Sequence, residues 1–230
     1  MKPQTIALDG TAASGKSTLG SRLAQALDYL FLDTGLMYRA VTWAVRHNQT
    51  DVHSEEAVSV LAENLDLQIT PPATDDARHA TIIVDNTDIT HQLHTPDVNQ
   101  YVSIVSSYRR VRQCLTKRQR QIANSGPVVM VGRDIGTVVL PHADLKLFTV
   151  ASPEVRARRR YQECLEMGQT VNFDELLASI IRRDKLDAEK PISPMVPADD
   201  AVILDTDRLS RDEVFAHVMT LIAAKEKEAV

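Results

Sequence analysis

Short apolar runs along the chain predict five buried β-strands. Each run is separated from the next by stretches with helical spacing; the five runs are Thr5–Leu8, Tyr29–Leu32, Pro127–Val131, Leu145–Val150 and Ala201–Leu204. Strands that are apolar on both faces are typical of a parallel sheet that helices cover on each side. The pattern therefore predicts an α/β fold with a five-stranded parallel sheet and flanking helices.

A different pattern lies between the second and third of these runs. Leu67–Thr70 and Ala80–Val84 are rich in strand-forming residues and flank a polar stretch that contains Pro71 and Pro72. Residues 85–87 read as a turn. This segment predicts a small antiparallel insertion in the parallel fold.

Three helix starts carry capping signals. A side chain that can accept hydrogen bonds from the first free N–H groups precedes each helical stretch; these residues are Ser152, Asn172 and Ser210. Pro153 follows the first of them, and Glu213 completes a capping box with Ser210.

The first strand leads through a glycine-containing loop into a helix predicted over Lys16–Leu27. Residues 10–17 read GTAASGKS, which matches the P-loop pattern GxxxxGK followed by Ser or Thr. Backbone N–H groups of such a loop wrap an anion, and the helix adds the positive end of its dipole. Lys16 is then placed to reach the outer phosphates of a nucleotide, and the Ser17 hydroxyl to bind Mg²⁺.

Composition and charge exclude several classes of protein. The chain is 43% hydrophobic and 25% charged, as globular proteins are, and its net charge of −5 argues against a nucleic-acid partner. No apolar run approaches the roughly 18 residues of a membrane span, and the N-terminus lacks the features of a signal peptide, so we expect a cytoplasmic protein with no membrane partner. Cys114 and Cys164 are expected to be reduced packing residues.

Basic residues are nevertheless clustered, so this acidic chain can focus positive potential on a small anion. In one cluster Arg156, Arg159 and Arg160 share a helix face at i, i+3 and i+4 spacing. We expect one or two of them to reach the site and Arg158 to face elsewhere.

The segment after the second strand is a candidate for a second anion site. Residues 33–39 read DTGLMYR and follow a strand end, where an open parallel sheet places its ligand crevice.

Near the C-terminus, residues 201–205 read AVILD, which imitates the strand and aspartate of a Walker B element. We interpret it instead as a last core strand that ends in a turn at Asp205, because no glutamate follows.

Further segments carry a specific resemblance. They are DTGLMYRA (33–40), VSIVSSYRRVRQCLTKRQR (102–120), GRDIGTVVLPHADLKLFTVAS (132–152), RRDKLD (182–187) and PMVPADDAVILDT (194–206). In order and across almost the whole chain, they resemble the bacterial cytidylate kinases of the long type, in the nucleoside monophosphate kinase family. The resemblance implies transfer of the γ-phosphoryl group of ATP to CMP or dCMP, with Mg²⁺, by what we expect to be a monomer.

The resemblance also implies a division of the chain. A P-loop NTPase-type core would comprise residues 1–33, 106–152 and 191–230. Residues 34–105 would form a monophosphate-binding region with the antiparallel insertion, and residues 153–190 a helical lid.

Site residues follow from the matching positions. The ATP phosphates would be held by Gly10, Thr11, Ala12, Ala13, Ser14, Gly15, Lys16, Ser17 and Thr18. Arg160 and Arg183 would join Lys16 in stabilising the transferring phosphoryl group. The acceptor phosphate would be held by Arg39 and Arg133, which also serves catalysis, and by Lys190. The cytosine edge would be read by Ser103, Arg112 and Asp134, and the ribose hydroxyls by Asp187 and Thr34.

Two positions depart from the family pattern. Thr11 stands where the family usually has proline, and Lys190 stands where it usually has arginine. Lysine keeps the positive charge but lacks the bidentate fork of a guanidinium.

Two other functions remain open. A P-loop kinase that phosphorylates a hydroxyl, such as a shikimate or nucleoside kinase, would benefit from a carboxylate base, for which Asp33 or Asp134 is available. A nucleotide-dependent switch would hydrolyse ATP slowly without any small acceptor. An acceptor screen separates both from a monophosphate kinase.

Overall fold

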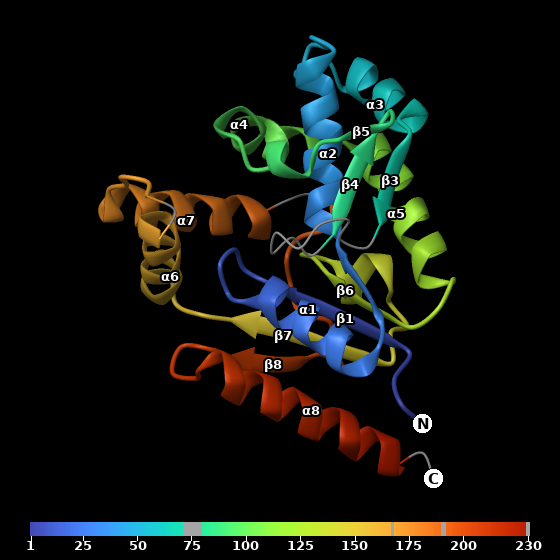
Figure 1. Ribbon diagram of the computed structural model, residues 1–230, viewed down its shortest axis with the longest axis vertical. Coiled ribbons are helices and arrows are strands. Elements are labelled where there is room, and N and C mark those ends of the chain that lie inside the picture. The colour runs from blue at the N-terminus through green and yellow to red at the C-terminus, as the bar shows by residue number, and fades with distance from the viewer. Residues whose placement is uncertain (71–79, 167, 190–191, 229–230) are drawn as a thin grey trace. The chain divides into compact units, whose positions relative to one another are not determined.

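The computed structural model describes residues 1–70, 80–166, 168–189 and 192–228 (Figure 1). The described chain divides into two compact units, each of which is presented by itself. Unit 1 comprises Met1–Leu30 and Gly126–Val230, and unit 2 comprises Phe31–Ser125. The three-part division into core, monophosphate-binding region and lid stays a prediction.

The main sheet has five strands in the order β2-β6-β1-β7-β8. The strands are β1 (Thr5–Gly10), β2 (Leu30–Asp33), β6 (Val128–Val131), β7 (Leu145–Val150) and β8 (Val202–Asp205). The central strand β1 runs parallel to β6 and β7, with Ile6 opposite Val129 and Leu145. Because β1 is flanked on both edges and buried on both faces, its apolar residues need not alternate with polar ones. The predicted parallel sheet is confirmed.

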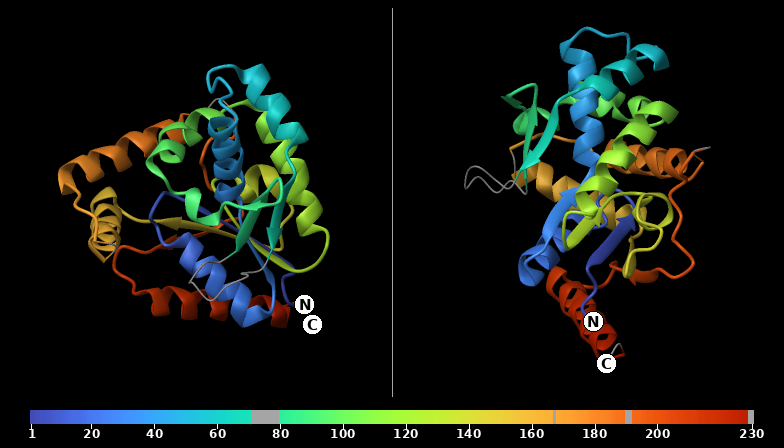
Figure 2. Two further views of the ribbon diagram at one scale, coloured as in Figure 1. Left: turned by 45° about the horizontal axis from the view of Figure 1, so that its top comes forward. Right: turned by 90° about the vertical axis from the view of Figure 1, so that its right-hand side faces the viewer.

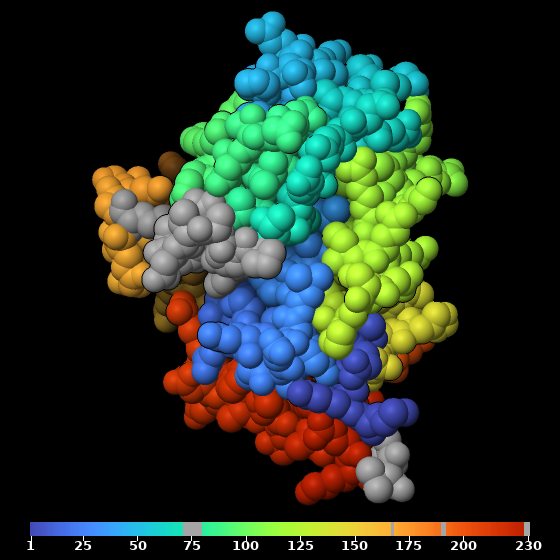
Figure 3. Space-filling view, turned by 45° about the vertical axis from the view of Figure 1, so that its right-hand side comes forward, coloured from blue at the N-terminus to red at the C-terminus, as the bar shows by residue number. Residues whose placement is uncertain are grey.

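Four helices accompany the sheet in unit 1. They are α1 (Lys16–Leu27), α6 (Pro153–Glu166), α7 (Phe173–Ala188) and α8 (Arg211–Glu228). Helix α1 packs against β6 and α8, and Figure 3 shows α8 (red) against α1 (blue) at the surface. Helices α6 and α7 pack against each other.

The predicted helix caps are confirmed. The Asn172 side chain accepts hydrogen bonds from the N–H groups of Asp174 and Glu175. Ser210 and Glu213 form the reciprocal capping box, each side chain accepting from the other residue's N–H. The start of α7 is therefore fixed by local chemistry.

Unit 2 combines helices with a small antiparallel sheet. The helices are α2 (Thr34–His47), α3 (Glu55–Asn64), α4 (Pro96–Val105) and α5 (Arg109–Ala123), with a 3-10 turn at Thr90–Gln92. The strands are β3 (Leu67–Thr70), β4 (Thr81–Val84) and β5 (Thr87–Asp88), in that order across the sheet (Figure 2). Asp85 and Asn86 turn the chain at φ values of 47° and 64°, which aspartate and asparagine tolerate. The predicted insertion is confirmed, and the stretch with Pro71 and Pro72 lies outside the described residues.

Among the helices that the structure describes, none combines the length and apolar character that crossing a membrane requires.

Candidate functional site

The P-loop joins β1 to α1 and is closed by its own side chains. Gly15 adopts a φ of 87° and Ala13 one of 58°, so the chain turns sharply before the helix. The Ser14 hydroxyl donates to the Thr11 carbonyl at 2.9 Å, and the Lys16 ammonium donates to the same oxygen at 3.0 Å. The ammonium group is thus held at the loop that would wrap an anion. Helix α1 has no acidic residue in its first turn to offset its positive end, which favours anion binding.

Gly10 is pressed against β7 at the start of this loop. Its φ is 147°, and a Cβ atom there would lie 2.2 Å from Thr149 Oγ1 and 2.3 Å from the Thr149 carbonyl oxygen. The Thr149 hydroxyl is also 2.7 Å from the Ser14 hydroxyl. Only glycine fits this position, and the contact anchors the P-loop on β7.

Arg133 connects the P-loop to helix α7. It donates from Nη1 to the Gly10 carbonyl at 2.6 Å and from Nε to Asp187 Oδ2 at 3.1 Å. Arg183 Nε lies 4.0 Å from the same Asp187 oxygen. Burial and the neighbouring Arg133 lower the pKa of Arg183, while Asp187 and Asp184 oppose that shift. Two guanidinium groups therefore converge on one carboxylate beside the P-loop, an arrangement suited to an additional anion.

Asp9 on β1 has a buried carboxylate and was not predicted as a site residue. Its Oδ1 and Oδ2 accept hydrogen bonds from the N–H groups of Ile135 and Gly136, both at 2.7 Å. These residues open the π-helical turn Ile135–Val139, directly after Arg133 and the buried Asp134. Asp9 thereby fixes the segment that carries two predicted substrate-binding residues. Burial raises the pKa of Asp9 to about 6, although the two N–H donors oppose the shift.

The raised pKa of Asp9 predicts a stability that depends on pH. The folded protein binds the proton more tightly than the unfolded chain, whose aspartate pKa is 3.8. The contribution of Asp9 to the free energy of unfolding therefore falls as the pH rises from about 4 to about 6, and is constant above that range. The measurement is the free energy of unfolding in urea of wild type minus that of Asp9→Asn. We expect this difference to fall by about 3 kcal/mol over this pH range, because every other titrating group contributes equally to both proteins. A difference that grows with pH would show that the two N–H bonds outweigh burial.

In unit 2 four predicted residues lie on α2 or on the helices α4 and α5, which pack against it. Thr34 is buried at the first position of α2, and Arg39 donates from Nη1 to Asn99 Oδ1 on α4 at 2.7 Å. Ser103 lies one turn further along α4 and is half-buried. The buried guanidinium of Arg112 on α5 lies 5.5 Å from the centroid of the Tyr38 ring on α2. Helices α2, α4 and α5 thus contribute polar groups to one neighbourhood of unit 2.

Other predicted residues lie apart from these groups or outside the description. Arg160 donates from Nη1 to Glu163 on its own helix at 3.1 Å. Of the arginines that share its face, Arg159 donates to Thr206, and Arg156 is fully buried. Lys190 lies outside the described residues. The turn predicted after the last strand is confirmed, because Asp205 accepts a hydrogen bond from the N–H of Asp207.

Sequence reasoning missed the carboxylates of Asp9 and Asp184. Asp9 stands at the end of an otherwise apolar strand, and a charged residue inside such a run is the signal that points to a fixed role. Asp184 has no comparable signal, because it follows two arginines on a helix with many exposed charges.

Comparisons with known proteins match the chain over nearly its whole length. A family model described as cytidylate kinase matches residues 6–224. The chain is 41% identical over 226 residues to a cytidylate kinase of Bacillus subtilis (strain 168), covering 98% of this chain and 99% of that protein. It is 46% identical over 222 residues to one of Roseiflexus castenholzii (strain DSM 13941 / HLO8), covering 96% and 94%. Because the match extends over nearly the full length, the chain belongs to the cytidylate kinase family.

Proposed function

We propose that this protein transfers the γ-phosphoryl group of ATP to the phosphate of CMP or dCMP, giving ADP and CDP or dCDP. The observation that carries the proposal is the family match over residues 6–224, which includes the P-loop and every predicted substrate residue. The arrangement of Lys16, Arg133 and Arg183 supports it, since a kinase with two anionic substrates needs cations at both.

The proposed chemistry needs positioning more than proton transfer. A phosphate monoester has a second pKa near 6, so the attacking oxygen of CMP is already anionic at neutral pH. No general base is required, which distinguishes this reaction from phosphorylation of a hydroxyl. The chain's task is to bring two repelling anions together in line and to keep water away.

Each group of residues has a proposed part in that task. P-loop N–H groups and Lys16 hold the ATP phosphates, and Arg183 stabilises the group in transfer. Arg133 and Arg39 hold the acceptor phosphate by bidentate contacts. Arg160 is proposed to turn from Glu163 toward the phosphates when substrates bind. Ser103, Arg112 and Asp134 suit the cytosine edge, which offers an exocyclic amine donor and ring acceptors.

Magnesium fits the donor chemistry at the start of α1. Ser17, the second residue of that helix, offers a hydroxyl oxygen, the kind of ligand that a hard cation accepts, and phosphate oxygens would supply others. When bound, the ion would neutralise charge on the phosphates. Because its hydroxyl stands at the start of α1, directly after Lys16, Ser17 is the residue that we propose for the ion.

An acceptor screen tests the proposal. ADP release is measured with ATP and, in turn, CMP, dCMP, UMP, AMP and shikimate. We expect turnover with CMP or dCMP well above that with the other acceptors. Preferred turnover of shikimate would favour a kinase acting on a hydroxyl, and equal ADP release without any acceptor would favour a nucleotide-dependent switch.

Asp134 provides a test of base recognition. An asparagine can present an amide donor where the carboxylate only accepts, so Asp134→Asn should lose kcat/KM for CMP relative to UMP, whose matching position is an acceptor oxygen. We expect a shift in discrimination of about 1 to 3 kcal/mol, the effect of an unpaired polar group in a closed site. The measurement is the CMP to UMP ratio of kcat/KM at saturating ATP. An unchanged ratio in a folded variant would remove Asp134 from base recognition.

A further inference from the structure

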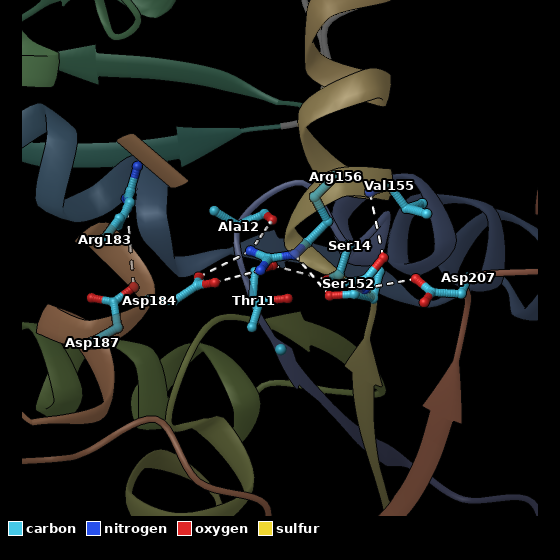
Figure 4. Close-up of polar contacts among 12 residues, drawn as sticks. Thr11, Ala12, Ser14, Ser152, Val155, Arg156, Arg183, Asp184, Asp187 and Asp207 are labelled. Atoms are coloured by element: carbon cyan, nitrogen blue, oxygen red, sulfur yellow. Dashed lines mark hydrogen bonds and ion pairs between the residues drawn. The ribbon is translucent and has the colours of Figure 1, made fainter. Parts of the chain in front are cut away.

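Arg156 is a buried arginine on α6 to which the proposed reaction assigns no part. Only 2% of its side chain is exposed. Nε donates to the Ala151 carbonyl at 2.9 Å, and Nη1 donates to the Ala12 carbonyl at 3.2 Å and to Asp184 Oδ1 at 2.9 Å. Nη2 donates to the other oxygen of Asp184. In Figure 4 the guanidinium lies between the P-loop residue Ala12 and the carboxylate of Asp184.

The cost of burying this pair indicates a role other than stability. Removing a guanidinium and a carboxylate from water carries a desolvation penalty that their attraction offsets only when the geometry is excellent. Apolar residues of similar volume often stabilise a core as well or better. What a bidentate ion pair adds is a fixed distance and orientation between the elements that carry its members.

The elements joined by Arg156 are those that carry the phosphate-binding groups. Ala12 follows Thr11, whose carbonyl accepts the Lys16 ammonium. Asp184 follows Arg183 directly and precedes Asp187 by three positions, so the two carboxylates lie on one face of α7. Helix α7 is therefore tied to the P-loop twice, through Asp184 and Arg156 to Ala12, and through Asp187 and Arg133 to Gly10.

Substrate binding would affect these two connections between α7 and the P-loop differently. Arg133 and Asp187 are proposed to contact the acceptor phosphate and the ribose, so their bond to each other competes with substrate. Arg156 and Asp184 use their polar atoms on each other and on two backbone carbonyls. This second tie can persist through the reaction.

We propose that Arg156 and Asp184 are a positioning pair that holds helix α7 against the P-loop, so that Arg183 meets the phosphoryl group in transfer. The inference rests on the proposed function. A misplacement of about 1 Å can lower a rate by up to about a hundredfold, so loss of the pair should act on kcat. The KM for ATP should change little, because the P-loop keeps its own contacts to Thr11 and Thr149.

The test replaces the pair with apolar residues of similar size. The double variant Arg156→Met with Asp184→Leu leaves no unpaired buried charge, so it should unfold at the wild-type temperature or above. We expect its kcat for CMP to fall at least tenfold, its KM for ATP to stay within about threefold, and its ATP hydrolysis per CDP formed to rise. A matched control is Lys185→Met with Glu189→Leu, an exposed pair formed by the last turn of α7 and the residue that caps it, with its charged atoms 3.9 Å apart. This control should keep the wild-type kcat.

The outcomes separate this inference from the proposed function. A wild-type protein that fails to phosphorylate CMP overturns the proposed function. If wild type and control are active, a double variant with the wild-type kcat overturns the positioning role. The positioning role is also overturned if the loss of kcat is no larger than the fraction of unfolded protein in the sample explains. Should the double variant not fold, Arg156→Lys, which keeps the charge but cannot bridge Ala12 and both Asp184 oxygens, is judged by the same kcat and hydrolysis criteria.

Discussion

Replacing Lys16 with alanine is expected to lower kcat for CMP phosphorylation about a hundredfold or more. The ammonium lies at the P-loop, 3.0 Å from the Thr11 carbonyl, at the positive end of α1. As the phosphoryl group leaves ATP, charge grows on the bridging and outer oxygens, and a preorganised cation stabilises that charge more than it stabilises bound ATP. The loss should therefore appear in kcat as well as in kcat/KM.

A steady-state assay with saturating ATP and CMP measures this effect, and circular dichroism checks that the variant is folded. Lys225→Ala is the matched control, because this exposed lysine lies in the last turn of α8. Near-normal turnover of Lys16→Ala would contradict the assignment of residues 10–18 to ATP phosphates.

The fold could be predicted from sequence because its signals are local. Strand β7 and helix α1 have the predicted boundaries. The apolar run sets the ends of β7, and α1 begins directly after Gly15 of the P-loop and ends before Asp28, whose φ is 59°. Strand β1 is two residues longer than the apolar run, because its pairing with β7 continues through Asp9 to Gly10. A polar side chain that finds backbone donors inside the core does not end a strand, and a hydrophobicity pattern alone does not reveal those donors.

Patterns of spacing and periodicity indicate site residues only where a motif is contiguous, and the dispersed candidates came from the family resemblance. The P-loop is such a motif. Three arginines share one helix face, yet each has different partners. Arg156 donates to Asp184 and Ala12, Arg159 donates to Thr206, and Arg160 donates to Glu163. Ala12 and Arg156 are 144 positions apart in the chain, and helix periodicity carries no information about a contact at that separation. Which arginine is buried depends on packing between α6, α7 and the P-loop.

Gly10 is a position that should be sensitive to a small change, because a single added carbon has nowhere to go. In Gly10→Ala the Cβ atom would lie 2.2 Å from Thr149 Oγ1 and 2.3 Å from the Thr149 carbonyl, and the backbone φ of 147° is itself strained for alanine. Overpacking contributes about 1 to 3 kcal/mol and the backbone strain about 1 to 3 kcal/mol. We therefore expect the free energy of unfolding to fall by about 2 to 6 kcal/mol.

Urea unfolding of Gly10→Ala and Gly126→Ala side by side measures this loss. A Cβ at Gly126 would meet no atom within 4 Å, and its φ is not in the left-handed region, so that variant should stay within about 0.5 kcal/mol of wild type. Because Gly10 also supplies the carbonyl that accepts Arg133, the shift needed to relieve the clash should displace the P-loop from that arginine and lower kcat in the molecules that still fold. Equal unfolding midpoints for the two variants would mean that β7 can yield at Thr149, and that the contact between Gly10 and Thr149 does not anchor the P-loop.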